Sequence, residues 1–131
     1  MIGDEDLVRK AREVVNPRQL SRFAEAGEVG CALVTDKGNV YTGVCIDTKC
    51  SMGFCAEHNA IGTMVTNGES CIVSIVAVDW DGAILAPCGR CREFIYQMDE
   101  QNAGTRVLLR NGKVMSLRDL LPEHWKDQVP A

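Results

Sequence analysis

Long apolar runs, basic net charge and aromatic residues are what this sequence lacks. No stretch approaches the roughly 20 apolar residues that a membrane-spanning helix requires, and the start, "MIGDEDLVRK", is too acidic for a secretory signal peptide. These two absences predict a cytoplasmic protein without membrane contact. Aromatic residues make up 5% of the chain, and its formal net charge is −4. Nucleic-acid binders need stacking and phosphate-binding surfaces, so we expect no nucleic acid partner and favour a small-molecule substrate or a protein partner.

Cysteine, in contrast, is abundant and odd in number. The seven cysteines are Cys31, Cys45, Cys50, Cys55, Cys71, Cys88 and Cys91. The cytoplasm is reducing and an odd count leaves one cysteine unpaired, so a disulfide framework is not expected. Metal binding or plain burial is the better interpretation. Those in or beside predicted strands are interpreted mostly as small buried apolar residues: Cys31, Cys45, Cys50 and Cys71.

Apolar periodicity and turn residues predict the secondary structure. The predicted helices cover 4–15, 55–65 with Gly68 as the C-terminal cap, 88–100, and a short final segment that enters at Ser116 and ends at Pro122. The predicted strands cover 29–35, 40–46, 71–79, 105–110 and 113–117, the last two joined by Asn111-Gly112. The chain of 131 residues contains no repeat or linker. We therefore expect one α/β domain over residues 1–131, a central sheet with helices on its faces.

Two short motifs carry the chemistry. Cys55-Ala56-Glu57 and Pro87-Cys88-Gly89-Arg90-Cys91 both fall at predicted helix starts. There the helix dipole favours thiolates, and cysteines three apart share one helix face. Thiolates favour zinc over magnesium or calcium. Three thiolate ligands leave one tetrahedral position open, as in catalytic zinc sites, and Glu57 is the candidate to move a proton beside it.

A closed site is the alternative interpretation of the same residues. Cys55-x-x-His58 together with Cys88-x-x-Cys91 forms a Cys₃His set, in which Glu57 is merely solvated. The protein would then be a non-catalytic structural-zinc binding module. His124, near the C-terminus, is expected at the surface rather than on a metal.

A zinc ligand, one residue and a glutamate, followed later by P-C-x-x-C, is the signature of the zinc deaminases. The sequence therefore resembles the cytidine deaminase superfamily, and "VGCALVTDKGNVYTGV" and "LRDLLP" extend the likeness over residues 29–122. Its three-cysteine form is similar to the homotetrameric nucleoside deaminases, among them cytidine deaminase and blasticidin-S deaminase. The resemblance implies a three-layer α/β/α sandwich around a mixed five-stranded sheet. It also implies a homotetramer, or a homodimer.

The resemblance further implies the reaction and the residues that perform it. Cys55, Cys88 and Cys91 would hold Zn²⁺, and Glu57 would protonate N3 of a cytosine ring while water activated by zinc attacks C4. Glu57 would then pass a proton to the leaving amine. A cytosine-type nucleoside would become the uracil-type nucleoside plus ammonia, with the backbone at Ala56 orienting the base.

Arg90, between two predicted ligands, has a candidate role of its own. Three thiolates leave the zinc site with a formal charge of about −1, which weakens the metal as a Lewis acid. A cation beside the sulfurs would withdraw that charge. Arg90 is the better candidate and His58 the second, and a solvated or subunit-interface arginine is the alternative.

The sequence departs from cytidine deaminases where those enzymes bind the sugar. Cys45 and Asp47 align with an Asn and a Glu that bind the ribose hydroxyls, and Gly27 replaces a Phe that lies near the base. Asp47 can accept a hydroxyl hydrogen bond, whereas Cys45 does so poorly. A modified or antibiotic cytosine nucleoside such as blasticidin S is therefore the alternative substrate.

Overall fold

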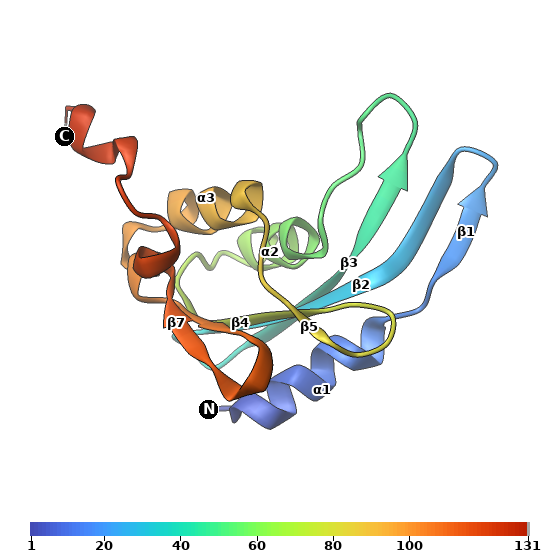
Figure 1. Ribbon diagram of the computed structural model, residues 1–131, viewed down its shortest axis with the longest axis horizontal. Coiled ribbons are helices and arrows are strands. Elements are labelled where there is room, and N and C mark those ends of the chain that lie inside the picture. Colours follow the sequence, from blue (N-terminus) through green and yellow to red (C-terminus); the bar gives the residue numbers. More distant parts are fainter. Residues whose placement is uncertain (131) are drawn as a thin grey trace.

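A mixed β-sheet runs through the middle of the protein, with helices on both faces (Figure 1). The computed structural model describes residues 1–130. The strands are β1 (Arg18–Ser21), β2 (Ala24–Thr35), β3 (Val40–Thr48), β4 (Ile72–Val78), β5 (Ile84–Leu85), β6 (Arg106–Leu108) and β7 (Val114–Ser116). The α-helices are α1 (Asp4–Val14), α2 (Ala56–Thr66) and α3 (Gly89–Met98). Short 3₁₀ helices cover Glu100–Gly104, Arg110–Gly112, Leu117–Leu120 and Trp125–Gln128.

The five expected strands form the body of the sheet in the order β3-β2-β4-β6-β7. β4 and β6 are parallel, and the other neighbouring pairs are antiparallel. Two short strands were not expected: β1 pairs with the first residues of β2, and β5 pairs with the end of β4. Every residue of β1 is exposed. Its sequence therefore does not need the apolar alternation that marks a half-buried strand, and the strand could not be predicted from that pattern.

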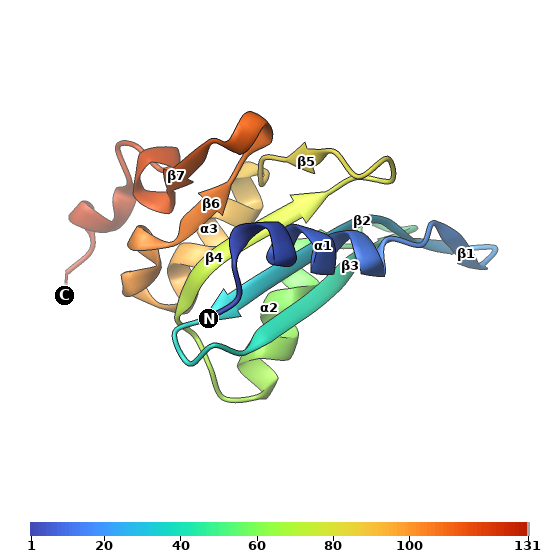
Figure 2. The same cartoon turned by 90° about the horizontal axis from the view of Figure 1, so that it is seen from below.

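Each face of the sheet has its own apolar core. α1 lies on one face, where Leu7 and Ala11 pack against Ala32 and Val34 of β2 (Figure 2). α2 and α3 lie on the other face, over Cys31 and Leu33. Alternate residues of β2 thus serve opposite cores. The expected three-layer α/β/α arrangement is confirmed.

Turns at the predicted places connect these elements. Gly68, with a φ of 84°, follows the end of α2. Asn111 and Gly112 both have positive φ, 62° and 71°, as a tight hairpin turn requires. Ser116 precedes the 3₁₀ helix Leu117–Leu120 as predicted, although its side chain makes no capping hydrogen bond.

Helix α2 lies unusually close to strand β3. A Cβ atom on Gly43 would lie 2.5 Å from the backbone nitrogen of Ala60 and 2.8 Å from Cβ of Asn59. The Asn59 side-chain amide donates a 3.1 Å hydrogen bond to the carbonyl of Val44. This close approach holds the start of α2, with Cys55 and Glu57, against the sheet.

A bulge interrupts β2 opposite Cys45. Ala26 pairs with Ile46 and Gly30 with Val44, so three residues of β2, 27–29, face one residue of β3. Gly27 has a φ of 90°, and a Cβ there would lie 2.1 Å from the carbonyl oxygen of Asn16. No side chain therefore fits at this position, where the resemblance to cytidine deaminases leads one to expect a Phe. The freed backbone N–H of Val29 donates to Sγ of Cys45 at 3.3 Å. Bulges of this kind redirect side chains near active sites.

Candidate metal centre and active site

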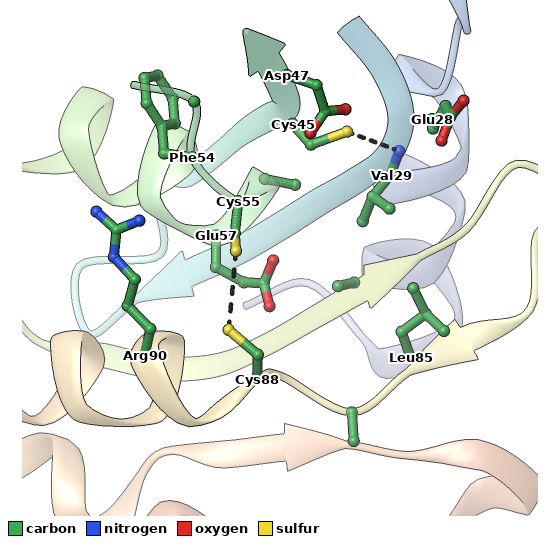
Figure 3. Close-up of a pocket in the computed structure, with 14 residues that line it drawn as sticks. Glu28, Val29, Cys45, Asp47, Phe54, Cys55, Glu57, Leu85, Cys88 and Arg90 are labelled. Carbon is green, nitrogen blue, oxygen red and sulfur yellow. Dashed lines mark hydrogen bonds between the residues drawn. The ribbon is translucent and has the colours of Figure 1, made fainter. Parts of the chain in front are cut away.

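Three thiols converge where α2 and α3 begin (Figure 3). Cys55 is the N-cap of α2, Cys88 is the N-cap of α3, and Cys91 lies one turn into α3. The sulfurs of Cys55 and Cys88 are 3.7 Å apart, and those of Cys88 and Cys91 are 3.5 Å apart. A tetrahedral zinc with bonds of about 2.3 Å separates its sulfur ligands by about 3.8 Å. The spacing therefore fits zinc.

His58 also belongs to this cluster. Its Nδ1 lies 3.4 Å from Sγ of Cys91, and its ring stacks on Phe94 with a centroid distance of 4.2 Å. The donor atoms of Cys55, His58 and Cys91 all lie within 4.8 Å of one another. The donors present thus suit zinc both as an open three-thiol set and as a closed set that includes His58.

Burial and mutual contacts set the protonation of the thiols. Burial raises the pKa of Cys55 and Cys91, and the charge of Glu57 raises both further. Burial also acts against ionisation of Cys88, but hydrogen bonds from the backbone N–H groups of Cys91 and Arg90 and from the other thiols outweigh it and lower its pKa. Cys88, at the helix start, is therefore the thiol most ready to serve as thiolate.

Glu57 lies beside the sulfurs although it is two residues beyond Cys55. Its side chain belongs to the first turn of α2, and the residue is only 5% exposed. Figure 3 shows the carboxylate next to the sulfurs of Cys55 and Cys88. Burial raises the pKa of Glu57, against the lowering effect of its own backbone N–H and of the Cys91 thiol. A carboxyl group with a raised pKa is suited to both accept and donate a proton.

A cavity of about 430 Å³ opens beside these groups. The predicted site residues that line it are Cys45, Asp47, Cys55, Ala56, Glu57, Cys88 and Arg90, and Cys91 lies buried beneath them. The structure thus brings every predicted site residue to one place. Figure 3 shows the Arg90 guanidinium extending away from the sulfurs, on the side of Phe54. Nδ1 of His58, by contrast, lies 3.4 Å from Sγ of Cys91.

Sequence reasoning missed the wall opposite the thiols. Glu28 and Val29, from the bulge of β2, line the cavity together with Phe54 and Leu85. An isolated glycine in a strand often marks a bulge, but Gly27 lies before the predicted strand 29–35, so the sequence pattern did not show that it belongs to β2. Phe54 is placed by a single β-bridge to Ile46, which no local pattern indicates.

Two of the peripheral expectations need correction. The side chain of His124 is only 7% exposed, because its Nε2 lies 2.9 Å from Oε1 of Glu93 and its ring packs against Tyr96. It is therefore not the free surface residue that was expected. Cys31 and Cys45 are buried as expected, but Cys71 is only partly buried and Cys50 is exposed.

Comparisons with known proteins agree with this geometry. Residues 1–104 match the family described as the cytidine and deoxycytidylate deaminase zinc-binding region. A cytidine deaminase from Mycobacterium tuberculosis is 31% identical over 113 residues, which is 84% of this chain and 79% of that protein. A blasticidin-S deaminase from Bacillus cereus is 33% identical over 106 residues, covering 72% of this chain and 74% of that protein.

The fold is similar to that of solved deaminases. The crystal structure of the cytidine deaminase from Mycobacterium tuberculosis superposes with a TM-score of 0.79 at 26% identity, over 95% of this chain and 98% of that one. That of the cytidine deaminase from Burkholderia pseudomallei gives a TM-score of 0.75 at 26% identity, over 94% and 99%. Motif, fold and donor cluster agree, and the chain belongs to the cytidine and deoxycytidylate deaminase family.

Proposed function

We propose that this protein is a zinc-dependent hydrolase that converts a cytosine-type nucleoside into the uracil-type nucleoside and ammonia. One observation carries the proposal: a buried carboxylate, Glu57, shares a 430 Å³ cavity with the thiols of Cys55 and Cys88. A cavity of this size suits a small organic ligand. A purely structural zinc site has no need of a buried acid with a raised pKa facing an open cavity.

Cys55, Cys88 and Cys91 hold the zinc ion in this proposal. Their sulfur spacing of 3.5–3.7 Å supports the assignment. When bound, zinc supplies a water molecule of lowered pKa that can attack at neutral pH. Nδ1 of His58 lies 3.4 Å from Sγ of Cys91, where the imidazole can stabilise the thiolate by a hydrogen bond. Arg90, which lines the cavity, adds positive charge on the side of Phe54.

Glu57 carries the protons. Its carboxylate takes a proton from the attacking water and delivers it to N3 of the cytosine ring, which makes C4 more electrophilic. It then takes the second proton, from the hydroxyl group now on C4, and transfers it to the amine; the C4–N bond breaks, ammonia leaves and the C4 oxygen becomes the carbonyl. Burial favours both steps, since it raises the pKa of Glu57 toward the working range of an acid–base catalyst. The buried Ala56, between ligand and acid, orients the base through its backbone.

The sugar lies against Cys45 and Asp47 in this proposal. Asp47 can accept a hydrogen bond from a sugar hydroxyl. Cys45 is already engaged by the Val29 N–H at 3.3 Å, and it offers only a weak sulfur acceptor to a ligand. A second candidate substrate, a modified or antibiotic nucleoside such as blasticidin S, is supported by this departure. The likeness to a blasticidin-S deaminase supports it too.

We also propose that residues 1–131 act as one unit that assembles into a homotetramer, or a homodimer. The β1–β2 hairpin and the loop after β3 project on the same side of the molecule (Figure 1) and expose apolar side chains: Leu20 in β1, Phe23 in the turn after it, and Met52 after β3. Exposed apolar groups gathered on neighbouring loops favour a protein interface. A cytoplasmic location is supported by the seven free thiols. No helix within residues 1–130 has the length and apolar character to cross a membrane.

A substrate panel tests the proposal. Zinc-loaded protein is incubated with cytidine, deoxycytidine, 5-substituted and N4-substituted cytidines and blasticidin S, and ammonia release is measured. We expect turnover of at least one of these compounds, and removal of zinc by a chelator should abolish it. Absence of turnover across the whole panel, in protein that holds one zinc per chain, would favour the structural-zinc alternative.

A further inference from the structure

Two sets of three metal donors overlap where α2 and α3 begin. Sγ of Cys88 lies 3.7 Å from Sγ of Cys55 and 3.5 Å from Sγ of Cys91. The donor atoms of Cys55, His58 and Cys91 also lie within 4.8 Å of one another. Cys55 and Cys91 therefore belong to both sets, and the sets differ in their third member, Cys88 or His58.

The spacing of the donors along each helix produces this overlap. Cys55 and His58 are three residues apart at the start of α2, as Cys88 and Cys91 are at the start of α3. Residues three apart share one face of a helix, so each helix presents a pair of donors to the other helix. With bonds of about 2.0 Å to nitrogen and 2.3 Å to sulfur, tetrahedral zinc separates these two ligand atoms by about 3.6 Å. The 3.4 Å between Nδ1 of His58 and Sγ of Cys91 fits this separation.

Cys88 and His58 line different hollows of the protein. Cys88 is exposed and lines the active-site cavity. His58 lines a second hollow, of about 590 Å³, between α2 and α3. The ring of Phe94 stacks on the imidazole with an interplanar angle of 6° and holds it beside Cys91. His58 is thus kept next to the two shared thiols from outside the cavity.

We propose that His58 is a reserve zinc ligand that takes the place of Cys88 when this thiol leaves the metal. Cys55, Cys91 and His58 then supply three protein ligands, the number that an open zinc site requires. An imidazole binds metal as the neutral ring, so this exchange needs no further thiolate. Solutes reach the exposed Cys88, whereas Cys91 is buried. A substitute for Cys88 therefore protects the site against loss of zinc. The inference rests on the proposed three-thiol zinc site and not on the identity of the nucleoside.

Single substitutions of the two cysteines of α3 test the overlap. Cys88→Ala leaves Cys55, Cys91 and His58, so the variant should still bind one zinc per chain. Cys91→Ala removes a shared thiol and leaves Cys88 and His58 in different hollows, so the variant should lose the zinc. Zinc content is measured after dialysis against a fixed concentration of free zinc, and circular dichroism checks that each variant is folded.

The two histidines of the chain provide the matched control. Cys88→Ala/His58→Ala keeps only two thiols of the cluster and should hold no zinc under the same conditions. Cys88→Ala/His124→Gln removes the other histidine, whose ring contacts Glu93 and Tyr96 rather than the thiols. This second double variant should keep the zinc.

Cobalt(II) in place of zinc identifies the ligands directly. The wild type should show the thiolate-to-cobalt absorption of three sulfur ligands and no paramagnetically shifted imidazole N–H resonance. Cys88→Ala should retain about two-thirds of that absorption, because two of the three thiolates remain. It should also gain one shifted N–H resonance, exchangeable with deuterium, from the bound imidazole of His58.

The outcomes separate the reserve ligand from the alternatives. Retention of zinc by Cys88→Ala, with its loss from Cys88→Ala/His58→Ala, supports the inference. Loss of zinc from folded Cys88→Ala overturns it and leaves the three-thiol site standing. Retention of zinc by Cys91→Ala or by Cys88→Ala/His58→Ala also overturns it. A shifted imidazole N–H resonance in the wild type would identify a closed site of four ligands, and the reserve role and the proposed open site would fall together.

Discussion

The close contact at Gly43 of β3 fixes the position of helix α2, whose start carries Cys55 and Glu57. In Gly43→Ala, the new methyl group would lie 2.5 Å from the backbone nitrogen of Ala60 and 2.8 Å from Cβ of Asn59. Neither neighbour is the flexible end of a side chain, so the contact is relieved only if α2 moves away from β3. Ordinary carbon contacts begin near 3.5 Å, so α2 must move by roughly 1 Å.

That movement has a cost in stability and a cost in rate. Inserting a methyl group into a close-packed core typically costs about 1–3 kcal/mol, and we expect a loss near 2 kcal/mol in the free energy of unfolding. A shift of about 1 Å in catalytic groups lowers the rate by roughly 100-fold. Cys55 and Glu57 travel with α2, so kcat/KM should fall by about that factor.

Urea unfolding and steady-state kinetics of the zinc-loaded variant measure the two effects. Gly62→Ala is the matched control, because Gly62 lies on the same helix and nothing lies within 4 Å of a Cβ placed there. That substitution should stabilise the protein by about 0.5–1 kcal/mol, since alanine favours the helix interior. If Gly43→Ala keeps wild-type stability and wild-type kcat/KM, the close packing of α2 does not position the site, and the reasoning is refuted.

Two further substitutions test the site and the fold separately. His58→Ala should still bind one zinc per chain, because the three thiols suffice as ligands. The cobalt-substituted variant should show an absorption spectrum typical of three thiolate ligands. Loss of the metal would instead identify His58 as the fourth ligand of a closed site. Glu69→Gln removes a buried carboxylate that accepts hydrogen bonds from Tyr41 and Asn39, bonds that, with Thr35, lower its pKa below the ordinary value. A folded-state pKa below the unfolded one stabilises the protein above the unfolded pKa, and the contribution is lost as pH falls through the folded pKa. Acidification below about pH 4.5, which is near the pKa of an unperturbed glutamate, should therefore lower the midpoint temperature of thermal unfolding more steeply in the wild type than in Glu69→Gln. Parallel profiles would contradict the assignment.

Local patterns in the sequence were sufficient to predict the frame of the site. The five main strands and the three α-helices follow from apolar periodicity, and Gly68 and Asn111-Gly112 mark turns with positive φ. Cys55 and Cys88 lie at helix starts because each follows a loop and precedes a helical pattern. The joint placement of Cys55, Glu57 and Cys88 was predicted from the two motifs at helix starts, and in the structure the three residues line one cavity.

Contacts between distant segments could not be predicted in the same way. The stacking of His58 on Phe94 joins two helices, and the covering of His124 depends on Glu93. Neither contact has a signal within a window of ten residues. The bulge that brings Glu28 into the cavity depends on Asn16 filling the space beside Gly27, which only the folded chain reveals.

The measurement that tests the central claim most directly is deamination by the Glu57→Gln variant in its zinc-loaded form. Glutamine keeps the shape of the side chain, so the variant should fold, hold one zinc per chain and bind the nucleoside. It cannot accept a proton from water, so kcat should fall by about 10²–10⁴-fold, the range of general acid–base catalysis. A variant that holds zinc and deaminates at the wild-type rate would show that Glu57 does not carry the proton, and the mechanism would be wrong.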